Sequence, residues 1–254
     1  MSVNKKVTFI MTSCNRFDLL EQTLNSFLKY NTSFIDKYIF IEDTEKIGKL
    51  EKIIKNIPEV YEKAILLNND PKLGQIKSID KAYSFVETEY IFHCEEDWEF
   101  YKKGFIEDSI KLLEEDSMII NVWLRELDDT NKHPVLDKEF ISLSGLKFRE
   151  LKTHHLGIWH GFTFNPTVKR LSDYKKIGMY QNVGHEHDIG QFFFDLGHKA
   201  VIFSEGYLKH SGWHRGVFDV DKKRSKFQME LDTWFKKKKA SLYKVLGIYG
   251  KKYK

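Results

Sequence analysis

The chain has 254 residues, of which 41% are hydrophobic, 31% are charged and only 4 are proline. This composition supports one substantial core and argues against disorder, and no apolar run reaches the ~18 residues that a membrane span needs. The start, MSVNKKVTFIMTSCNR, lacks an apolar signal region, so we expect a cytoplasmic protein. The net charge of +4 is concentrated in Lys236 to Lys239 and the final KKYK, so the nearly neutral body excludes the basic field of a nucleic-acid-binding protein.

Strand and helix patterns alternate along the first hundred residues. The spacing of apolar side chains predicts strands over 7–12, 38–41, 64–67 and 90–94, and amphipathic helices over 15–28, 47–57 and 76–86. Such alternation is typical of a mostly parallel sheet with helices on both faces. Farther along, the pattern predicts strands over 118–124, 162–165 and 200–203 and a helix over 186–196.

Three polar clusters directly follow predicted strands, namely 12–16, 42–44 and 95–97. In open parallel sheets, ligands bind beyond the carboxyl ends of the strands, and these clusters are expected at that edge. The third cluster is Glu95-Glu96-Asp97, whose mutual repulsion favours a bound cation. Mg²⁺ and Mn²⁺ take carboxylate oxygens together with substrate phosphates, which predicts a metal site here. The alternative is a solvated acidic turn, and in either case we expect Asp97 to be exposed and dispensable for folding.

The first hundred residues resemble the family-2-type GT-A glycosyltransferases. The segment VTFIMTSCNRFDLLEQTLNSFL is similar to the opening strand, turn and helix of that family, and the acidic turn at 41–44, the helix segment at 73–82 and the acidic motif at 91–98 follow in the family's order. EEDWEFYKKGF also resembles the Glu-Asp-Asp motif of N-acetylglucosaminyltransferases. The resemblance implies an α/β GT-A fold, with a Rossmann-like nucleotide-binding half (1–100) and an acceptor-binding half (101–225), followed by a basic amphipathic helical tail (226–254).

The resemblance also implies roles for single residues. Asp97 would ligate Mn²⁺ or Mg²⁺, Glu95 would lie near the ribose or a metal-bound water, and Glu42 or Asp43 would accept hydrogen bonds from the base. The remaining residues implied to surround the nucleotide sugar are Thr12, Asn15, Arg16, Gln75, Lys77 and Glu96. The family's Asp-Asp-Gly-Ser turn is Glu42-Asp43-Thr44-Glu45 here and its Asp-x-Asp is Glu95-Glu96-Asp97, so the donor nucleotide stays open.

An inverting transfer needs a carboxylate that removes the proton of the acceptor hydroxyl. The segment from Gly184 to Gly197 resembles the Glu-Asp-x-Asp region of the family, which implies Glu186 as the base and Asp188 as the second acid. The alternative is that both acids only favour the N-terminal end of a helix. A zinc hydrolase is a further alternative, although histidines two residues apart, as His185 and His187 are, diverge on a helix.

Two more clusters carry candidate functions. His210, His214 and Arg215 follow the last predicted strand, where several GT-A enzymes complete the metal or diphosphate site, although a structural role is the alternative for each. Sugars stack on aromatic rings, so Trp159, His160 and Phe162 are candidates for an acceptor platform, with core packing equally open. The two cysteines, Cys14 and Cys94, are expected to be buried free thiols.

These observations together predict an inverting, metal-dependent glycosyltransferase. It would move a sugar from a nucleoside-diphosphate donor to a hydroxyl of a glycan or lipid-linked glycan, and UDP-sugars are the donors that we expect. Two alternatives stay open. A nucleotidyltransferase would open with a Gly-rich basic loop where this chain has SCNR, and a non-catalytic carbohydrate-binding relative would have lost the acids. The tail either contacts an anionic membrane or packs on the domain.

Overall fold

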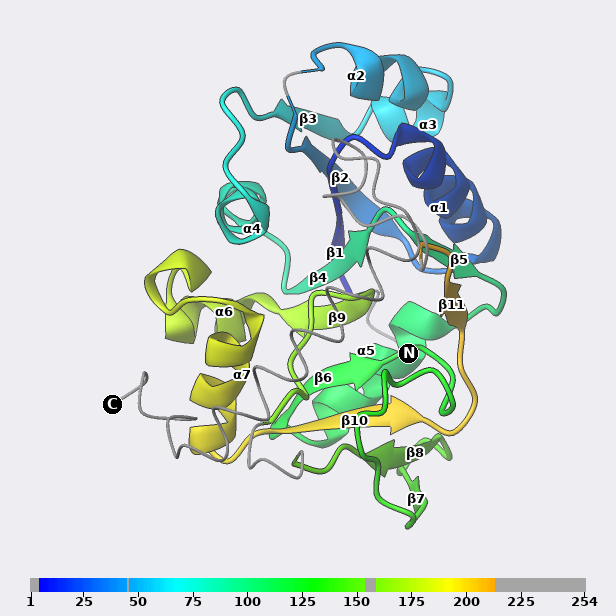
Figure 1. The fold of residues 1–254 in the computed structure, drawn as a ribbon. Helices are drawn as coiled ribbons and strands as arrows, with labels where there is room; N and C mark the ends of the chain where they lie inside the picture. The colour runs from blue at the N-terminus through cyan, green and yellow to red at the C-terminus, as the bar shows by residue number, and fades with distance from the viewer. Residues whose placement is uncertain (1–4, 45, 154–158, 213–254) are drawn as a thin grey trace, which may run out of the picture. The chain divides into compact units, whose positions relative to one another are not determined.

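The computed structural model describes residues 5–44, 46–153 and 159–212 (Figure 1). Its central sheet has five strands in the order β3-β2-β1-β4-β9. Four of them run parallel, namely β1 (Val7–Ser13), β2 (Ile35–Glu42), β3 (Ala64–Asn68) and β4 (Tyr90–Glu95), whereas β9 (Thr167–Arg170) pairs antiparallel with β4. The predicted α/β class with a mostly parallel sheet is confirmed. The predicted tail, 226–254, lies outside the described residues.

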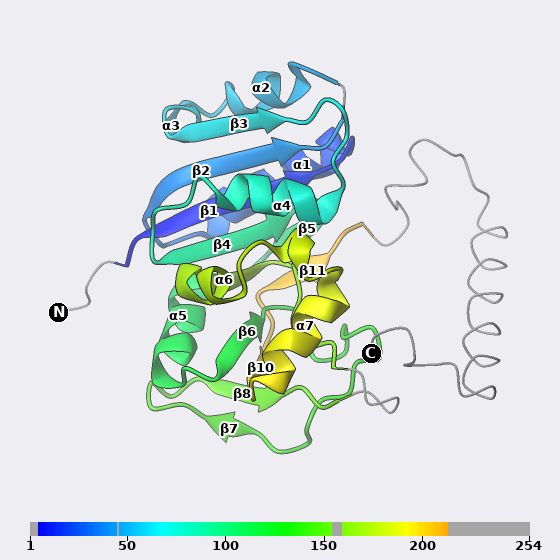
Figure 2. The same cartoon turned by 90° about the vertical axis from the view of Figure 1, so that its left-hand side faces the viewer.

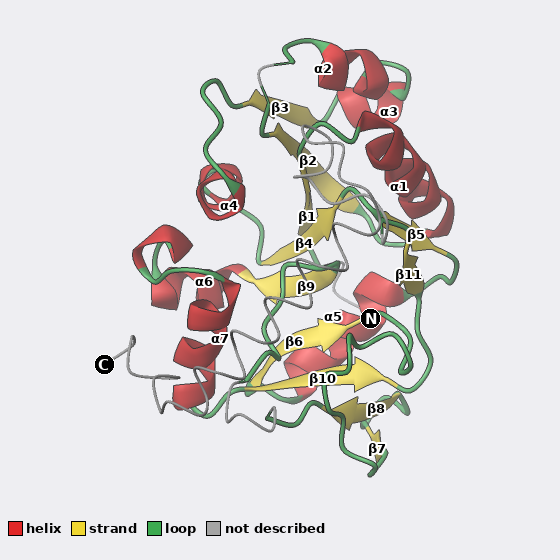
Figure 3. Ribbon diagram, viewed as in Figure 1, coloured by secondary structure: helices red, strands yellow, loops and turns green. Residues whose placement is uncertain are grey.

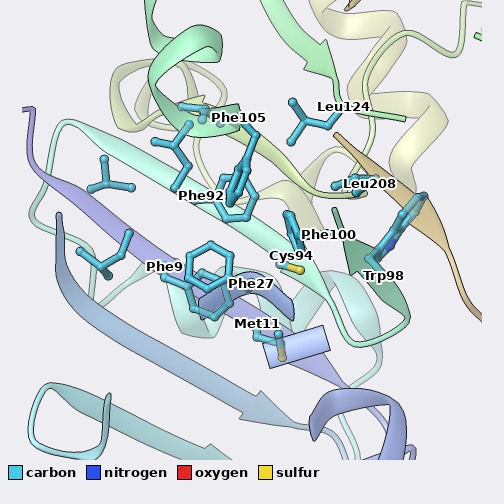
Figure 4. Close-up of a cluster of buried hydrophobic side chains, with 14 of the residues drawn as sticks. Phe9, Met11, Phe27, Phe92, Cys94, Trp98, Phe100, Phe105, Leu124 and Leu208 are labelled. Carbon is cyan, nitrogen blue, oxygen red and sulfur yellow. The ribbon is translucent and has the colours of Figure 1, made fainter. Parts of the chain in front are cut away.

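Helices cover both faces of this sheet (Figures 2 and 3). Successive side chains of a strand point to opposite faces, so Phe9 and Met11 enter one apolar cluster and Ile10 enters the other. The first cluster includes residues of α1 (Phe17–Tyr30), α2 (Lys49–Ile54), α3 (Pro58–Tyr61) and α5 (Phe105–Glu115). The second includes residues of α4 (Gln75–Tyr83), α6 (Leu171–Ile177) and α7 (Glu186–Asp195). Figure 4 shows part of the first cluster, in which the rings of Phe9 and Phe27 lie 4.3 Å apart.

The other strands of the described chain build two smaller sheets. One has the order β6-β10-β8-β7 and consists of β6 (Ile119–Trp123), β7 (Phe140–Ile141), β8 (Lys147–Glu150) and β10 (Lys199–Phe203). The other joins β5 (Trp98–Phe100) to β11 (Leu208–His210), and a 3-10 turn, η1, spans Tyr180–Asn182. Within the described residues no helix is long and apolar enough to cross a membrane.

Two predicted elements differ from the structure. The helix expected over 47–57 is shorter, at Lys49–Ile54, and Pro58 begins a separate helix after it. Residues 162–165 form no strand, and β9 starts only after Pro166, which lacks the amide hydrogen that a sheet requires. Both cysteines are free thiols as expected, with Cys94 buried and Cys14 partly buried.

Candidate active site

The three polar clusters lie together at one edge of the central sheet. Thr12 at the end of β1 pairs with Ile41 of β2 on one side and with Glu95 of β4 on the other. Ser13 is level with Glu42, which in turn is level with Asn68 of β3. The carboxyl ends of four parallel strands therefore meet, as the spacing of the sequence predicts.

Two buried carboxylates hold the turn that follows β1. The amide of Asn15 donates to Glu42 Oε1 at 2.6 Å, and the amide of Cys14 donates to Glu96 Oε1 at 3.1 Å. Asn15 has a left-handed backbone (φ +59°), a conformation that asparagine tolerates better than most residues. Glu42 and Glu96 are buried and accept hydrogen bonds from backbone amides, so they fix the shape of this edge of the sheet.

Asp43 organises the loop between β3 and α4. Its Oδ1 accepts hydrogen bonds from the Asn69 side chain (3.0 Å) and the Leu73 amide (2.7 Å), while its Oδ2 accepts from the Gly74 amide (2.8 Å). Gly74 precedes α4, so Asp43 fixes where that helix begins. Gln75 and Lys77, two further residues predicted to surround the nucleotide sugar, are exposed on the first turn of α4. The Gln75 side chain donates a hydrogen bond to Glu95 Oε1 at 2.9 Å.

Arg16 neutralises part of the acidic triplet. Its guanidinium donates to Glu96 Oε1 at 2.8 Å and to Asp97 Oδ2 at 2.7 Å, with all three side chains less than a tenth exposed. Arg16 is the cation in direct contact with the triplet, and the charges of Arg125 and Lys169 also reach Glu95. Burial, followed by the charges of Asp97, Glu186 and Glu96, raises the pKa of Glu95 to about 8. Burial is the larger cause, and only the like-charge part of the shift is a repulsion that an additional cation at the triplet would relieve.

Asp97 and His210 are the best candidate metal ligands in the described chain. Burial opposes ionisation of Asp97, but the His210 hydrogen bond and the Arg16 charge lower its pKa, so it stays a carboxylate. His210 Nε2 lies 3.1 Å from Asp97 Oδ2, about the separation of adjacent ligand atoms on a small divalent ion. No group of three or more His, Cys, Asp or Glu residues that could hold a metal ion occurs among the described residues. The pair therefore fits two positions of a Mn²⁺ or Mg²⁺ ion, which usually keeps waters and substrate phosphates as further ligands. The predicted His214 and Arg215 lie outside the described residues.

The expectation that Asp97 is exposed was wrong. Asp97 is buried, because Arg16, eighty-one residues earlier in the chain, and His210 both reach it. Its backbone is fixed as well. The hydroxyl of Thr23 in α1 donates to the Glu96 carbonyl at 2.7 Å and accepts from the Trp98 amide at 3.0 Å, so the acidic turn is anchored on both sides of Asp97.

Glu186 and Asp188 have different surroundings on the first turn of α7. Glu186 Oε2 accepts the Phe164 amide at 2.9 Å. Burial raises the pKa of Glu186, although that amide and Lys169 oppose the shift. Asp188 instead accepts the amide of His185 at 2.8 Å, which is the reciprocal half of a capping box. Glu186 is thus directed toward the site and Asp188 toward the start of its own helix.

Lys169 is a charged residue of this site that the sequence analysis did not single out. It is buried on β9, and its Nζ donates to Thr163 O at 2.7 Å and to Asn121 Oδ1 at 3.1 Å. Burial lowers the pKa of Lys169 to about 7, against the charges of Glu186, Asp173 and Glu95. A lysine in the middle of a short strand is ordinarily placed on the surface, so the sequence carried no clear sign of it.

The sequence profile of glycosyl transferase family 2 matches residues 8–170. The chain belongs to glycosyl transferase family 2. The match covers β1 to β9 and includes the acidic triplet but stops before Glu186 and His210. No curated protein matches the chain significantly.

Solved structures of similar fold are GT-A glycosyltransferases. The mannosyltransferase PcManGT from Pyrobaculum calidifontis, in complex with GDP-Man and Mn²⁺, has a TM-score of 0.61 at 12% identity over 85% of this chain and 59% of its own. GalNAc-T7 with UDP, GalNAc and Mn²⁺ has a TM-score of 0.59 at 11% identity, over 83% of this chain and 44% of its own. TarS 1-349 of S. aureus has a TM-score of 0.57 at 14% identity, over 82% of this chain and 60% of its own. This family 2 chain therefore spans between 44% and 60% of these relatives, and the likeness shows the GT-A fold.

A pocket of about 310 Å³ opens beside Glu186 in this family 2 chain. A type I′ turn builds its rim, since Asn131 and Lys132 both have positive φ and the His133 amide donates to Thr130 O. Of the predicted acceptor residues, exposed His160 lines this pocket, whereas the rings of Trp159 and Phe162 are buried in the second apolar cluster. Their burial favours the core interpretation for both rings. The lining consists of Trp123, Thr130, Asn131, His133, His160, Thr163, Asn165 and Glu186.

A column of rings and one guanidinium connects the metal candidates to this pocket. Arg125 is buried, with its guanidinium carbon 5.0 Å from the Trp98 ring and 5.7 Å from the Trp123 ring. Trp98 contacts the His210 ring at 4.8 Å, and Trp123 contacts the His133 ring at 5.5 Å. The column thus packs between the Asp97–His210 pair and the pocket beside Glu186.

We expect Gly212→Ala to disturb the pair of candidate metal ligands, Asp97 and His210. A Cβ at Gly212 would lie 2.4 Å from Asp97 Oδ2 and 2.6 Å from Asp97 Cβ, so the carboxylate would have to move. The variant should bind nucleoside diphosphate normally without metal but lose the gain in affinity that Mn²⁺ confers, measured by isothermal titration calorimetry. Ser211→Ala, an exposed neighbour, is the matched control. A full Mn²⁺ effect in Gly212→Ala would contradict the assignment.

Proposed function

We propose that the chain is a metal-dependent, inverting glycosyltransferase that uses a nucleoside-diphosphate sugar, UDP-sugars first, and a hydroxyl acceptor on a glycan or lipid-linked glycan. The observation that carries the proposal is the arrangement of Asp97, Glu95 and Glu186. The first two lie at the end of the parallel strands, and Glu186 approaches Glu95 closely enough for its charge to raise the pKa of that acid. The GT-A relatives that contain GDP-Man or UDP with Mn²⁺ support the choice of donor class.

In the proposed reaction, Glu186 accepts the proton of the acceptor hydroxyl. The acceptor oxygen forms a bond to the anomeric carbon from the side opposite the diphosphate, and the bond from that carbon to the phosphate oxygen breaks. The electron pair leaves with the nucleoside diphosphate. A divalent ion held by Asp97 and His210 would stabilise the negative charge of that leaving group. The pocket beside Glu186 would hold the acceptor, with His160 at its surface.

A panel of nucleotide sugars, each incubated with the full chain and Mn²⁺, tests the proposal. Release of nucleoside diphosphate that requires Mn²⁺ and one particular sugar is the expected result, and thermal shift should identify the same donor, because a ligand stabilises the fold that binds it. Release of pyrophosphate from a nucleoside triphosphate and a sugar phosphate would instead indicate a nucleotidyltransferase. Donor or glycan binding without any release would indicate a non-catalytic relative.

We also propose that the protein works in the cytoplasm and that its C-terminal segment contacts an anionic membrane. The support for the membrane contact is the sequence alone, in which the run Lys236 to Lys239 directly follows Trp234 and Phe235 and precedes Leu242. Each such lysine near an anionic surface contributes about 1 kcal/mol. Co-sedimentation with phosphatidylserine vesicles tests this, and equal binding by the full chain and by a chain ending at residue 230 would refute it.

A further inference from the structure

Lys169 and Glu186 are joined through one peptide group. Lys169 Nζ donates to the carbonyl oxygen of Thr163 at 2.7 Å, and the amide hydrogen of Phe164 is donated to Glu186 Oε2 at 2.9 Å. The Thr163 carbonyl and the Phe164 amide belong to the same peptide unit, so the contacts form a chain of two hydrogen bonds from ammonium to carboxylate. We propose that Lys169 is a positioning residue for Glu186, which it keeps ionised and oriented through the Thr163–Phe164 peptide.

The physical reason is polarisation of that peptide. An ammonium bound to the carbonyl oxygen withdraws electron density, which strengthens the amide hydrogen as a donor to the carboxylate. The charge of Lys169 also acts directly, and it lowers the pKa of Glu186 against the effect of burial. Both effects favour the ionised form, which is the form a general base needs. This inference rests on the proposed role of Glu186 as the base.

The position of Lys169 is fixed by its surroundings. Its Nζ also bonds Asn121 Oδ1 and lies 4.0 Å from the centroid of the Phe162 ring. The Asn121 amide donates to the same Thr163 carbonyl at 3.3 Å, so three elements converge on this peptide. The segment they hold, Thr163 and Phe164, precedes Pro166 and belongs to no strand, and it therefore lacks the ladder bonds that would otherwise fix it.

Other charged or titratable groups also face Glu186 and must be considered in any titration. Glu95 at the end of β4 is close enough that the charge of Glu186 raises the pKa of Glu95. His133 and His160 line the same pocket as Glu186, and His185, His187 and Asp188 are its neighbours in the chain at the start of α7. Lys169 itself faces Glu186, Glu95 and Asp173, and its charge lowers the pKa of buried His93. Because burial lowers the pKa of Lys169 to about 7, its ammonium group is fully charged only below that pH.

The test is a direct titration of the Glu186 carboxyl by ¹³C NMR in the metal-free full chain, assigned by the resonance that Glu186→Gln removes. In Lys169→Met the pKa of Glu186 should rise by about 1 unit, the usual effect of losing a nearby opposite charge. Lys169→Gln, which keeps a donor to Thr163 O without the charge, should give a smaller rise. The acid limb of kcat/KM should move upward by the same amounts, with about a tenfold lower rate on that limb.

Lys199→Met is the matched control, because Lys199 is a partly buried lysine that pairs with Asp116 and Glu150 away from the site. Lys199→Met should lower the free energy of unfolding without shifting the NMR titration of Glu186 or the acid limb of kcat/KM. An unchanged Glu186 titration in both Lys169 variants would overturn the relay. If instead the NMR shift occurs but Glu186→Gln transfers sugar normally, the relay stands and the assignment of the base fails.

Discussion

Asp97→Asn is expected to abolish the Mn²⁺ dependence of donor binding and to reduce transfer by about 100-fold or more, the range for removing one preorganised electrostatic group. Asparagine keeps the shape of the side chain but removes the charge that a divalent ion requires. The proposal places the ion at Asp97 and His210, whose atoms lie 3.1 Å apart. Initial rates and donor affinities measured with and without Mn²⁺ check this outcome.

The same substitution should also cost stability, since Asp97 is buried. Arg16 keeps its bond to Glu96 at 2.8 Å but loses its ionic partner at 2.7 Å, so we expect a loss of about 1–3 kcal/mol in the free energy of unfolding. Binding must therefore be measured well below the Tm of the variant. Glu99→Gln is the control, because Glu99 is an exposed acid two residues away that pairs with Lys209. Mn²⁺-dependent transfer that survives in Asp97→Asn would remove the metal hypothesis.

The edge of the sheet could be predicted from the sequence because it depends on local patterns. An apolar strand followed by polar residues recurs three times, and parallel strands joined by helices bring their carboxyl ends together whatever the details of packing. The predicted clusters at 12–16, 42–44 and 95–97 therefore coincide in space with few assumptions. Strand and helix ends in this half differ from the prediction by only a few residues.

Which acids are buried could not be predicted in the same way. Arg16 and Glu96 are eighty residues apart, and their ion pair exists only because β1 and β4 are neighbours and α1 packs against β5. The sequence places the acids at one edge but does not say that Glu42, Glu96 and Asp97 turn inward to protein donors. Periodicity specifies faces of elements, whereas such pairs depend on the register of distant segments.

The part of the site around Glu186 was harder to predict from the sequence, because it also depends on contacts between distant segments. Residues 162–165 read as a strand because they alternate aromatic and polar side chains, yet they form a loop whose peptide groups bind Lys169 and Glu186. A resemblance to family motifs located Glu186, but Lys169 belongs to no motif. Its importance appears only when β9, the loop before it and α7 are seen together.

Glu186→Gln should leave donor binding unchanged and reduce kcat by about 100-fold or more, the usual contribution of a general base. Glutamine can still accept the Phe164 amide through its oxygen, so the local structure should persist. In the unmodified enzyme, activity should fall as the pH decreases through the pKa of Glu186, since only the carboxylate accepts a proton. Burial raises that pKa above its ordinary value, which moves the acid limb upward.

Asp188→Asn is the matched variant for this prediction. Asparagine still accepts the His185 amide, so the helix start should survive and kcat should stay within a few fold of the unmodified enzyme. Transfer is measured as release of nucleoside diphosphate at saturating donor, and donor binding separately by calorimetry. If Asp188→Asn were inactive and Glu186→Gln active, the base would be two residues farther along α7, and the bond from the Phe164 amide would then serve only to hold that helix against the loop at 163–165.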